Sequence, residues 1–193
     1  MSFGLSLLVC TLAFGPPAAS RERPRLVNTI DYHVRSTDPL IRAWIKNGAA
    51  ESQTLSGLLA ELAASDVIVH VVLVNRIAGG ANGQLYFVTA TPTARYLRVE
   101  ITRLGGRADT IALIAHELQH AAEVAAAARV RDSLSLSSLY LGMSEPRRDS
   151  GHYDSAAARV TEDIVRREVI SHRTQSDEEL QLTAQLRPSA HLR

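Results

Sequence analysis

The spacing of apolar residues predicts two helices before residue 65. The first begins at Pro39, because proline is favoured in the first turn of a helix, and is expected to end at Gly48. The second begins at Thr54 or Ser56. In both segments apolar side chains recur every three or four positions: Leu40, Ile41, Trp44 and Ile45 in the first, and Leu55, Leu58, Leu59 and Leu62 in the second.

Between residues 67 and 101 the pattern changes to that of β-strands. Residues 67–74 and 85–90 are rich in β-branched and aromatic side chains, and residues 96–101 alternate apolar with polar positions. A glycine-rich turn at 79–83 follows the first strand, and Pro92 ends the second. Three successive strands of this kind most simply form an antiparallel meander.

Two further helices are predicted in the second half of the chain. An alanine-rich helix runs from about Thr110 into the region 129–132, and a last helix covers 153–170. The polar residues 133–151 between them predict a long loop. The expected fold class is therefore α+β: N-terminal helices, a three-stranded antiparallel sheet and two later helices.

The N-terminal residues differ from the rest in composition. The first twenty carry no charge, and an apolar run at 3–14 followed by small residues predicts a signal peptide over 1–20, although the usual positively charged start is missing. A buried or frayed N-terminal segment is the alternative. The run is too short for a stable membrane span, so a secreted or periplasmic protein is expected. Residues 21–36 are expected to be a linker, 37–172 one domain and 173–193 a flexible tail.

Composition narrows the classes of function. The chain has 21 Lys+Arg against 20 Asp+Glu and only 5% aromatic residues, which argues against a nucleic-acid partner. Its single cysteine, Cys10, lies in the predicted signal peptide, so the mature domain is expected to lack disulfides and thiolate chemistry.

One motif contains residue types that can bind a metal ion and catalyse a reaction. His116 and His120 stand four residues apart on the alanine-rich helix, so both project from one face and can bind one Zn²⁺. Glu117 follows the first histidine, and in this H-E-x-x-H arrangement a glutamate acts as general base on the metal-bound water. Apolar residues on both sides make burial of these groups costly unless a metal satisfies them. The alternative is an exposed polar stripe on an otherwise apolar helix.

The motif helix resembles a known superfamily. The run Ile114-Ala115-His116-Glu117-Leu118-Gln119-His120-Ala121-Ala122-Glu123-Val124 resembles the zincin metallopeptidases, and more closely small bacterial gluzincin-like proteins with an H-E-L-Q-H-A-x-E-[VI] helix. The resemblance spans roughly residues 66–169. It implies a minimal zincin-like domain, a Zn²⁺ cofactor and hydrolysis of a peptide or protein substrate.

The third zinc ligand is less clearly marked. Glu123 and Ala126 stand where metzincins have Gly and His, so that branch is excluded. Gluzincin-like proteins take an acidic ligand from a later helix, and the resemblance implies Asp154, in Tyr153-Asp154-Ser155-Ala156-Ala157, for this role. Asp is one methylene shorter than the usual Glu, so the two helices must approach closely.

Alternatives to Asp154 remain open. Glu162, Glu123 and His152 are the other candidate ligands. Glu123 lies on the same helix face as His116, where it would either orient a ligand histidine or form a structural salt bridge.

Three functional hypotheses follow from these residues. The first is a zinc-dependent hydrolase, a metallopeptidase that aligns an extended peptide along a sheet edge. The second is a degenerate, secreted zinc-binding or interaction domain that no longer cleaves. The third is an interaction domain with an accidental motif. Zinc stoichiometry separates the third from the others, and activity that depends on Glu117 separates the first from the second.

Overall fold

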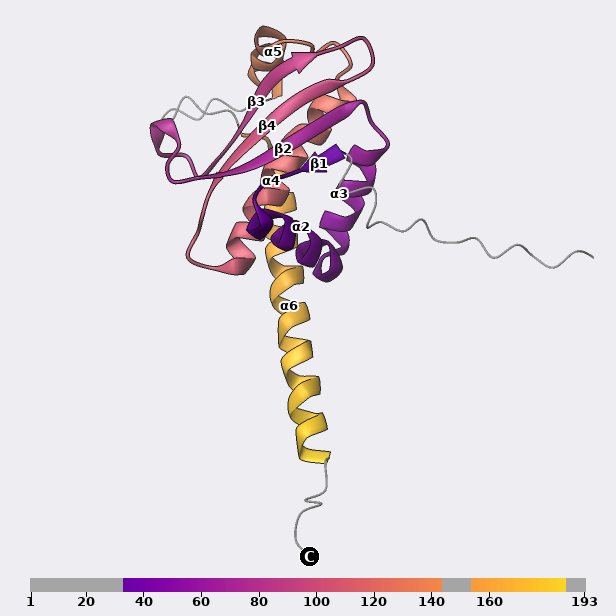
Figure 1. Cartoon of the computed structure of the whole chain (residues 1–193), viewed down its shortest axis with the longest axis vertical. Coiled ribbons are helices and arrows are strands. Elements are labelled where there is room, and N and C mark those ends of the chain that lie inside the picture. Colours follow the sequence, from indigo (N-terminus) through magenta and orange to yellow (C-terminus); the bar gives the residue numbers. More distant parts are fainter. Residues whose placement is uncertain (1–32, 144–153, 187–193) are drawn as a thin grey trace, which may run out of the picture.

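The computed structural model describes residues 33–143 and 154–186 (Figure 1). Within these ranges, four strands form one sheet and the helices pack against it or against one another. The strands are β1 (Val34–Arg35), β2 (Val67–Val74), β3 (Gly83–Ala90) and β4 (Arg95–Thr102). The helices are α2 (Pro39–Glu51), α3 (Gln53–Ala63), α4 (Arg107–Ala126), α5 (Ser133–Met143) and α6 (Ala156–Leu186).

The sheet is mixed, with strand order β1-β2-β4-β3. β2 pairs in parallel with both β1 and β4, whereas β3 pairs antiparallel with β4. The predicted α+β class is confirmed. The predicted three-stranded antiparallel meander is wrong, because β4 lies between β2 and β3, and because β1 adds a strand within the segment expected to be a linker.

The composition of β2 explains its interior position. Apart from His70, residues 67–74 are continuously apolar, a pattern typical of strands with parallel neighbours on both sides. β3 lies at the edge of the sheet, beyond β4. The connection from β2 to β3 contains the 3-10 turn η1 (Ala78–Gly80). Gly79 and Gly80 both have a φ of 78°, which side chains other than glycine rarely adopt.

The helices lie on one face of the sheet (Figure 1). α4 is central: it packs on β2, β3 and β4, and it also contacts α2, α3 and α6. In β2 and β4, five apolar side chains of the sheet are exposed by 1% or less: Val69, Val71, Leu97, Val99 and Ile101. They belong to the same hydrophobic core as the apolar residues of α4, and their burial stabilises the packing of α4 on the sheet.

The end predicted for the first helix is wrong, because α2 continues through Gly48 to Glu51. Gly48 lies against α4, where a Cβ would be 2.7 Å from Cγ2 of Ile111. Gly48 therefore allows α2 and α4 to pack closely, and the helix continues past it. Ser52 separates the two helices and caps α3, since its hydroxyl accepts a hydrogen bond of 3.0 Å from the Leu55 amide.

The later helices differ from the prediction in extent. The loop expected over 133–151 is wrong for residues 133–143, which form α5; Leu136, Leu139 and Tyr140 are buried there at helical spacing. α6 begins at Ala156 and runs past the expected end at residue 170, into the segment predicted to be a tail. No glycine or proline stands between residues 152 and 187 to stop it. Its second half extends away from the other elements (Figure 1).

The predicted signal peptide, residues 1–20, lies outside the described residues, as do residues 21–32 of the predicted linker. Among the helices of residues 33–143 and 154–186, none combines the length and apolar character that crossing a bilayer requires.

Candidate metal site

α4 carries the whole H-E-x-x-H motif on a helix that is held at both ends. It begins at Arg107, earlier than predicted, and ends at Ala126, several residues before the predicted end. At its start, Arg107 forms a two-pronged ion pair with Glu51 of α2, with both N–O distances 2.7 Å. The motif lies in the middle of the helix, where the backbone is most regular.

Arg95, at the start of β4, binds the C-terminal end of α4. The residue is 1% exposed, and its guanidinium donates hydrogen bonds to the carbonyls of Val124 (2.6 Å), Ala125 (3.0 Å) and Ala127 (2.9 Å). It also binds Asp66 at 2.5 Å and 2.9 Å. A cation at this end adds hydrogen bonds to the carbonyls where the helix ends, and its charge matches the helix dipole. Arg95 thus fixes α4, and its motif, to the sheet.

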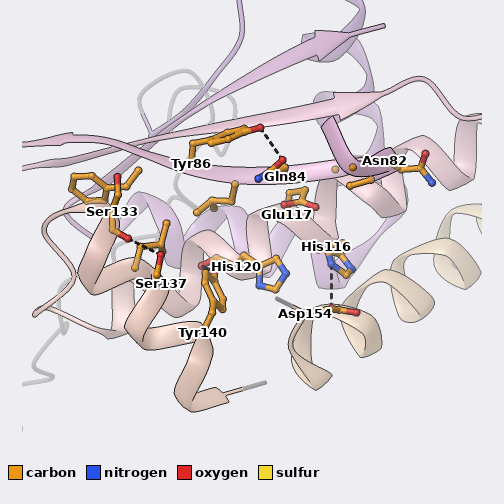
Figure 2. A pocket seen from close by; sticks show the side chains of 17 residues that line it. Asn82, Gln84, Tyr86, His116, Glu117, His120, Ser133, Ser137, Tyr140 and Asp154 are labelled. Carbon is orange, nitrogen blue, oxygen red and sulfur yellow. Dashed lines mark hydrogen bonds and ion pairs between the residues drawn. The ribbon is translucent and has the colours of Figure 1, made fainter. Parts of the chain in front are cut away.

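His116, His120 and Asp154 form one cluster. Each offers a ligand atom, and these atoms lie within 4.8 Å of one another. The two imidazole rings on α4 are 5.0 Å apart at an angle of 79°. Asp154 lies just before α6, with its Oδ1 3.5 Å from Nε2 of His116 (Figure 2). The shorter aspartate therefore reaches the histidines, because α6 packs closely on α4.

The donor set of this cluster fits Zn²⁺. Two imidazole nitrogens and one carboxylate are typical of catalytic zinc sites, which keep a fourth position open. Both Nδ1 atoms are engaged by other carboxylates, so Nε2 is the nitrogen each ring has left for an ion. The three residues predicted as metal ligands are thus brought together, and their binding of zinc stays a prediction.

The other candidate ligands lie behind the rings or cannot be placed. Oε2 of Glu162 is 3.0 Å from Nδ1 of His116, and Oε2 of Glu123 is 2.9 Å from Nδ1 of His120. Both carboxylates are therefore on the side of the ring away from Nε2. His152 lies outside the described residues.

The environment shifts the two imidazole pKa values in opposite directions. Burial lowers the pKa of His116, and a charge on His120 lowers it further, against the opposing effect of Asp154. Burial also lowers the pKa of His120, but the hydrogen bond to Glu123 and the charge of Glu117 outweigh it, so this pKa is raised.

Glu117 is buried beneath β3. Its residue is 4% exposed, and burial raises the pKa of its carboxyl to about 7, with His120 opposing and Asp154 adding to the shift. The carboxylate lies against Gly83 of β3, where a Cβ would be 2.9 Å from Cδ and Cγ of Glu117. Glycine at residue 83 therefore leaves room for the Glu117 carboxylate, which a larger side chain would displace.

A cleft of about 610 Å³ gives access to the cluster. β3 and the connection before it form one wall, α5 forms another, and His116, Glu117 and His120 point into it from α4 (Figure 2). Tyr140 of α5 stands edge-on to His120, with the ring centres 5.1 Å apart. Its hydroxyl donates to the His120 carbonyl at 3.3 Å. Within the described residues, no Lys or Arg lines this cleft.

The chain was also compared with known proteins. Comparison with protein families, curated proteins and solved structures finds no match. The site is therefore interpreted from its own geometry.

Sequence reasoning missed three residues that shape the site. The sequence pattern predicts only a turn at Gly83, and no pattern around Arg95 predicts its contacts. Tyr140 stands in a segment interpreted as loop, although its spacing from Leu136 is helical and could have placed it on the cleft wall.

Proposed function

We propose that this chain is a zinc-dependent hydrolase, a minimal zincin-like metallopeptidase. The observation that supports the proposal is the cluster of His116, His120 and Asp154, with the buried carboxylate of Glu117 beside it in one cleft. Glu117 favours chemistry over metal storage, because a structural zinc site is closed by four protein side chains and needs no adjacent base.

The residues take distinct roles in this proposal. His116, His120 and Asp154 hold the ion, which when bound acts as a Lewis acid on a substrate carbonyl and lowers the pKa of a water molecule. Glu117 accepts the proton of the attacking water and passes it to the leaving amine. β3 covers the Glu117 side chain, and both Gly83 and Glu117 line the cleft beside the histidines.

A peptide is the favoured substrate because of β3. This strand lines the cleft, and its outer edge pairs with no other strand among the described residues. An extended peptide could add to this edge by main-chain hydrogen bonds, which would place its carbonyls over the motif. The proposal includes action outside the cytoplasm, in keeping with the predicted signal peptide.

The test compares zinc content and peptide cleavage in the wild type, Glu117→Gln and Glu61→Gln. Glu61 is an exposed residue of α3, so its variant is a matched control. Glu117→Gln should lower the rate of cleavage of a fluorogenic peptide library by about 10²-fold or more. It should leave the zinc content unchanged. Glu61→Gln should change neither.

Each remaining outcome supports a different function. Zinc in the wild type without cleavage of any peptide would favour a non-catalytic zinc-binding domain. Cleavage that survives Glu117→Gln would contradict the assigned base. A wild type that binds no zinc would leave an interaction domain with an accidental motif.

A further inference from the structure

A carboxylate stands behind each imidazole of the cluster. Glu162 of α6 binds Nδ1 of His116 at 3.0 Å, and Glu123 of α4 binds Nδ1 of His120 at 2.9 Å. A carboxylate only accepts hydrogen bonds, so in both pairs the ring nitrogen donates. In a neutral imidazole the other nitrogen, Nε2, then carries the lone pair that a metal needs.

The carboxylate behind His120 is itself held in place. Oε1 of Glu123 accepts a hydrogen bond of 2.5 Å from the hydroxyl of Ser155. The same hydroxyl accepts a hydrogen bond of 3.0 Å from the Ala158 amide, so Ser155 also caps the first turn of α6. Ser155 directly follows Asp154, and one short segment therefore fixes both the proposed third ligand and the support of His120.

The carboxylate behind His116 is held by a second network. Glu162 binds Arg166 on the next turn of α6, and Arg166 binds Asp109 of α4 at 3.0 Å. Arg166 thereby joins the support of His116 to the first turn of the motif helix. Both supports connect α4 with the beginning of α6, one at each histidine.

We propose that Glu123 and Glu162 are positioning residues, which hold both imidazoles with Nε2 directed to a common point beside Asp154 before any ion binds. The inference rests on the zinc site of the proposed function and extends it to residues that do not touch the ion. Removal of such supporting groups typically weakens metal affinity by about 10- to 100-fold, because the ligands must then be ordered on binding.

A purely structural role for the same carboxylates makes a different prediction. If Glu123 and Glu162 only tie α6 to α4, their loss should lower the free energy of unfolding and leave the affinity of the folded site unchanged. Preorganisation predicts lost zinc affinity in protein that stays folded. It also predicts partial rescue by glutamine, whose amide oxygen can still accept from Nδ1.

The experiment measures the Zn²⁺ dissociation constant by competition with a fluorescent chelator, beside urea unfolding of the zinc-free proteins. The variants are Glu123→Ala, Glu123→Gln, Glu162→Ala and Glu162→Gln. Asp163→Asn is the control, because Asp163 also binds Arg166, at 2.9 Å, but contacts neither histidine. The alanine variants should bind zinc about 10- to 100-fold more weakly, the glutamine variants less so, and the control like the wild type.

A second readout needs no variant and no ion. In zinc-free wild type at a pH high enough to keep both imidazoles neutral, the ¹⁵N shifts of His116 and His120 should show Nδ1 protonated and Nε2 not. Alanine variants that bind zinc as tightly as the wild type, or the opposite ring tautomer in the wild type, would overturn the positioning roles and leave the proposed function standing. A wild type that binds no zinc would instead refute the proposed function, and this inference with it.

Discussion

Gly83→Ala should separate catalysis from folding and from zinc binding. The added Cβ would lie 2.9 Å from Cδ and Cγ of Glu117. Carbon atoms pack comfortably at about 3.5 Å, so the carboxylate must move by roughly 0.5 Å or more. Since a 1 Å displacement of a catalytic group can cost about 100-fold, we expect peptide cleavage to fall by about 10- to 100-fold.

The effect on stability should be small. Gly83 has no positive φ, so alanine fits its backbone, and alanine in a strand is favoured over glycine by about 0.5–1 kcal/mol. This gain offsets part of the cost of moving the flexible end of Glu117. The free energy of unfolding should therefore stay within about 1 kcal/mol of the wild type.

The assay for this variant combines three measurements. They are cleavage of the best peptide from the library, zinc by elemental analysis, and urea unfolding. Gly57→Ala is the control, because a Cβ on Gly57 of α3 would meet nothing within 4 Å. Unchanged cleavage by Gly83→Ala would refute the claim that β3 positions Glu117, and loss of zinc together with activity would show that Gly83 acts through the fold.

Two further predictions concern the attachment of α4 to the sheet. Arg95→Met keeps much of the side-chain volume but removes the hydrogen bonds to the end of α4 and to Asp66. The free energy of unfolding measured in urea should therefore fall by about 3 kcal/mol. A fall of less than about 1 kcal/mol would contradict this role of Arg95. Arg95 also lowers the pKa of Asp66 below 3.8, so the ionised carboxylate stabilises the fold above pH 3.8, and this contribution disappears as the pH falls through the lowered value. The difference in unfolding free energy between wild type and Asp66→Asn should therefore be constant near neutral pH and vanish in acid; a difference that grows in acid would reverse the assigned sign.

Much of the fold follows from local sequence patterns. The remaining parts are set by tertiary contacts. The strands at 67–74, 85–90 and 96–101 were predicted nearly to their ends, because alternation and β-branching act locally. The order of the strands in the sheet is not predicted by such patterns. The choice between a meander and a parallel β2–β4 pair depends on which strand the helices bury. The continuous apolar character of β2 is the one local feature that favours an interior parallel strand.

The helix at 133–143 was missed because its sequence alternates Ser and Leu, which obscures the helical spacing of its buried residues. The extent of α6 was missed for another reason. Its second half has few apolar residues, and the end was placed where the amphipathic pattern stops, although no glycine or proline breaks the chain there.

The site was predictable where its spacing is local. His116, Glu117 and His120 project together because of helical periodicity, and the structure places them on one cleft wall. Asp154 is implied only by the resemblance, and its approach to His116 depends on packing of α6 on α4 that no local pattern encodes. Single-residue contacts across the fold, such as Gly83 with Glu117, have no sequence signature at all.

The most direct test of the proposed zinc site is the zinc content of the purified protein by elemental analysis, for wild type, His116→Ala and Asp154→Ala. Urea unfolding of the zinc-free proteins shows that each variant is folded. The proposal predicts about one zinc per chain in the wild type and loss of zinc in both variants. A wild type without zinc, even after incubation with the ion, would contradict the metal site, and retention in Asp154→Ala would contradict the third ligand.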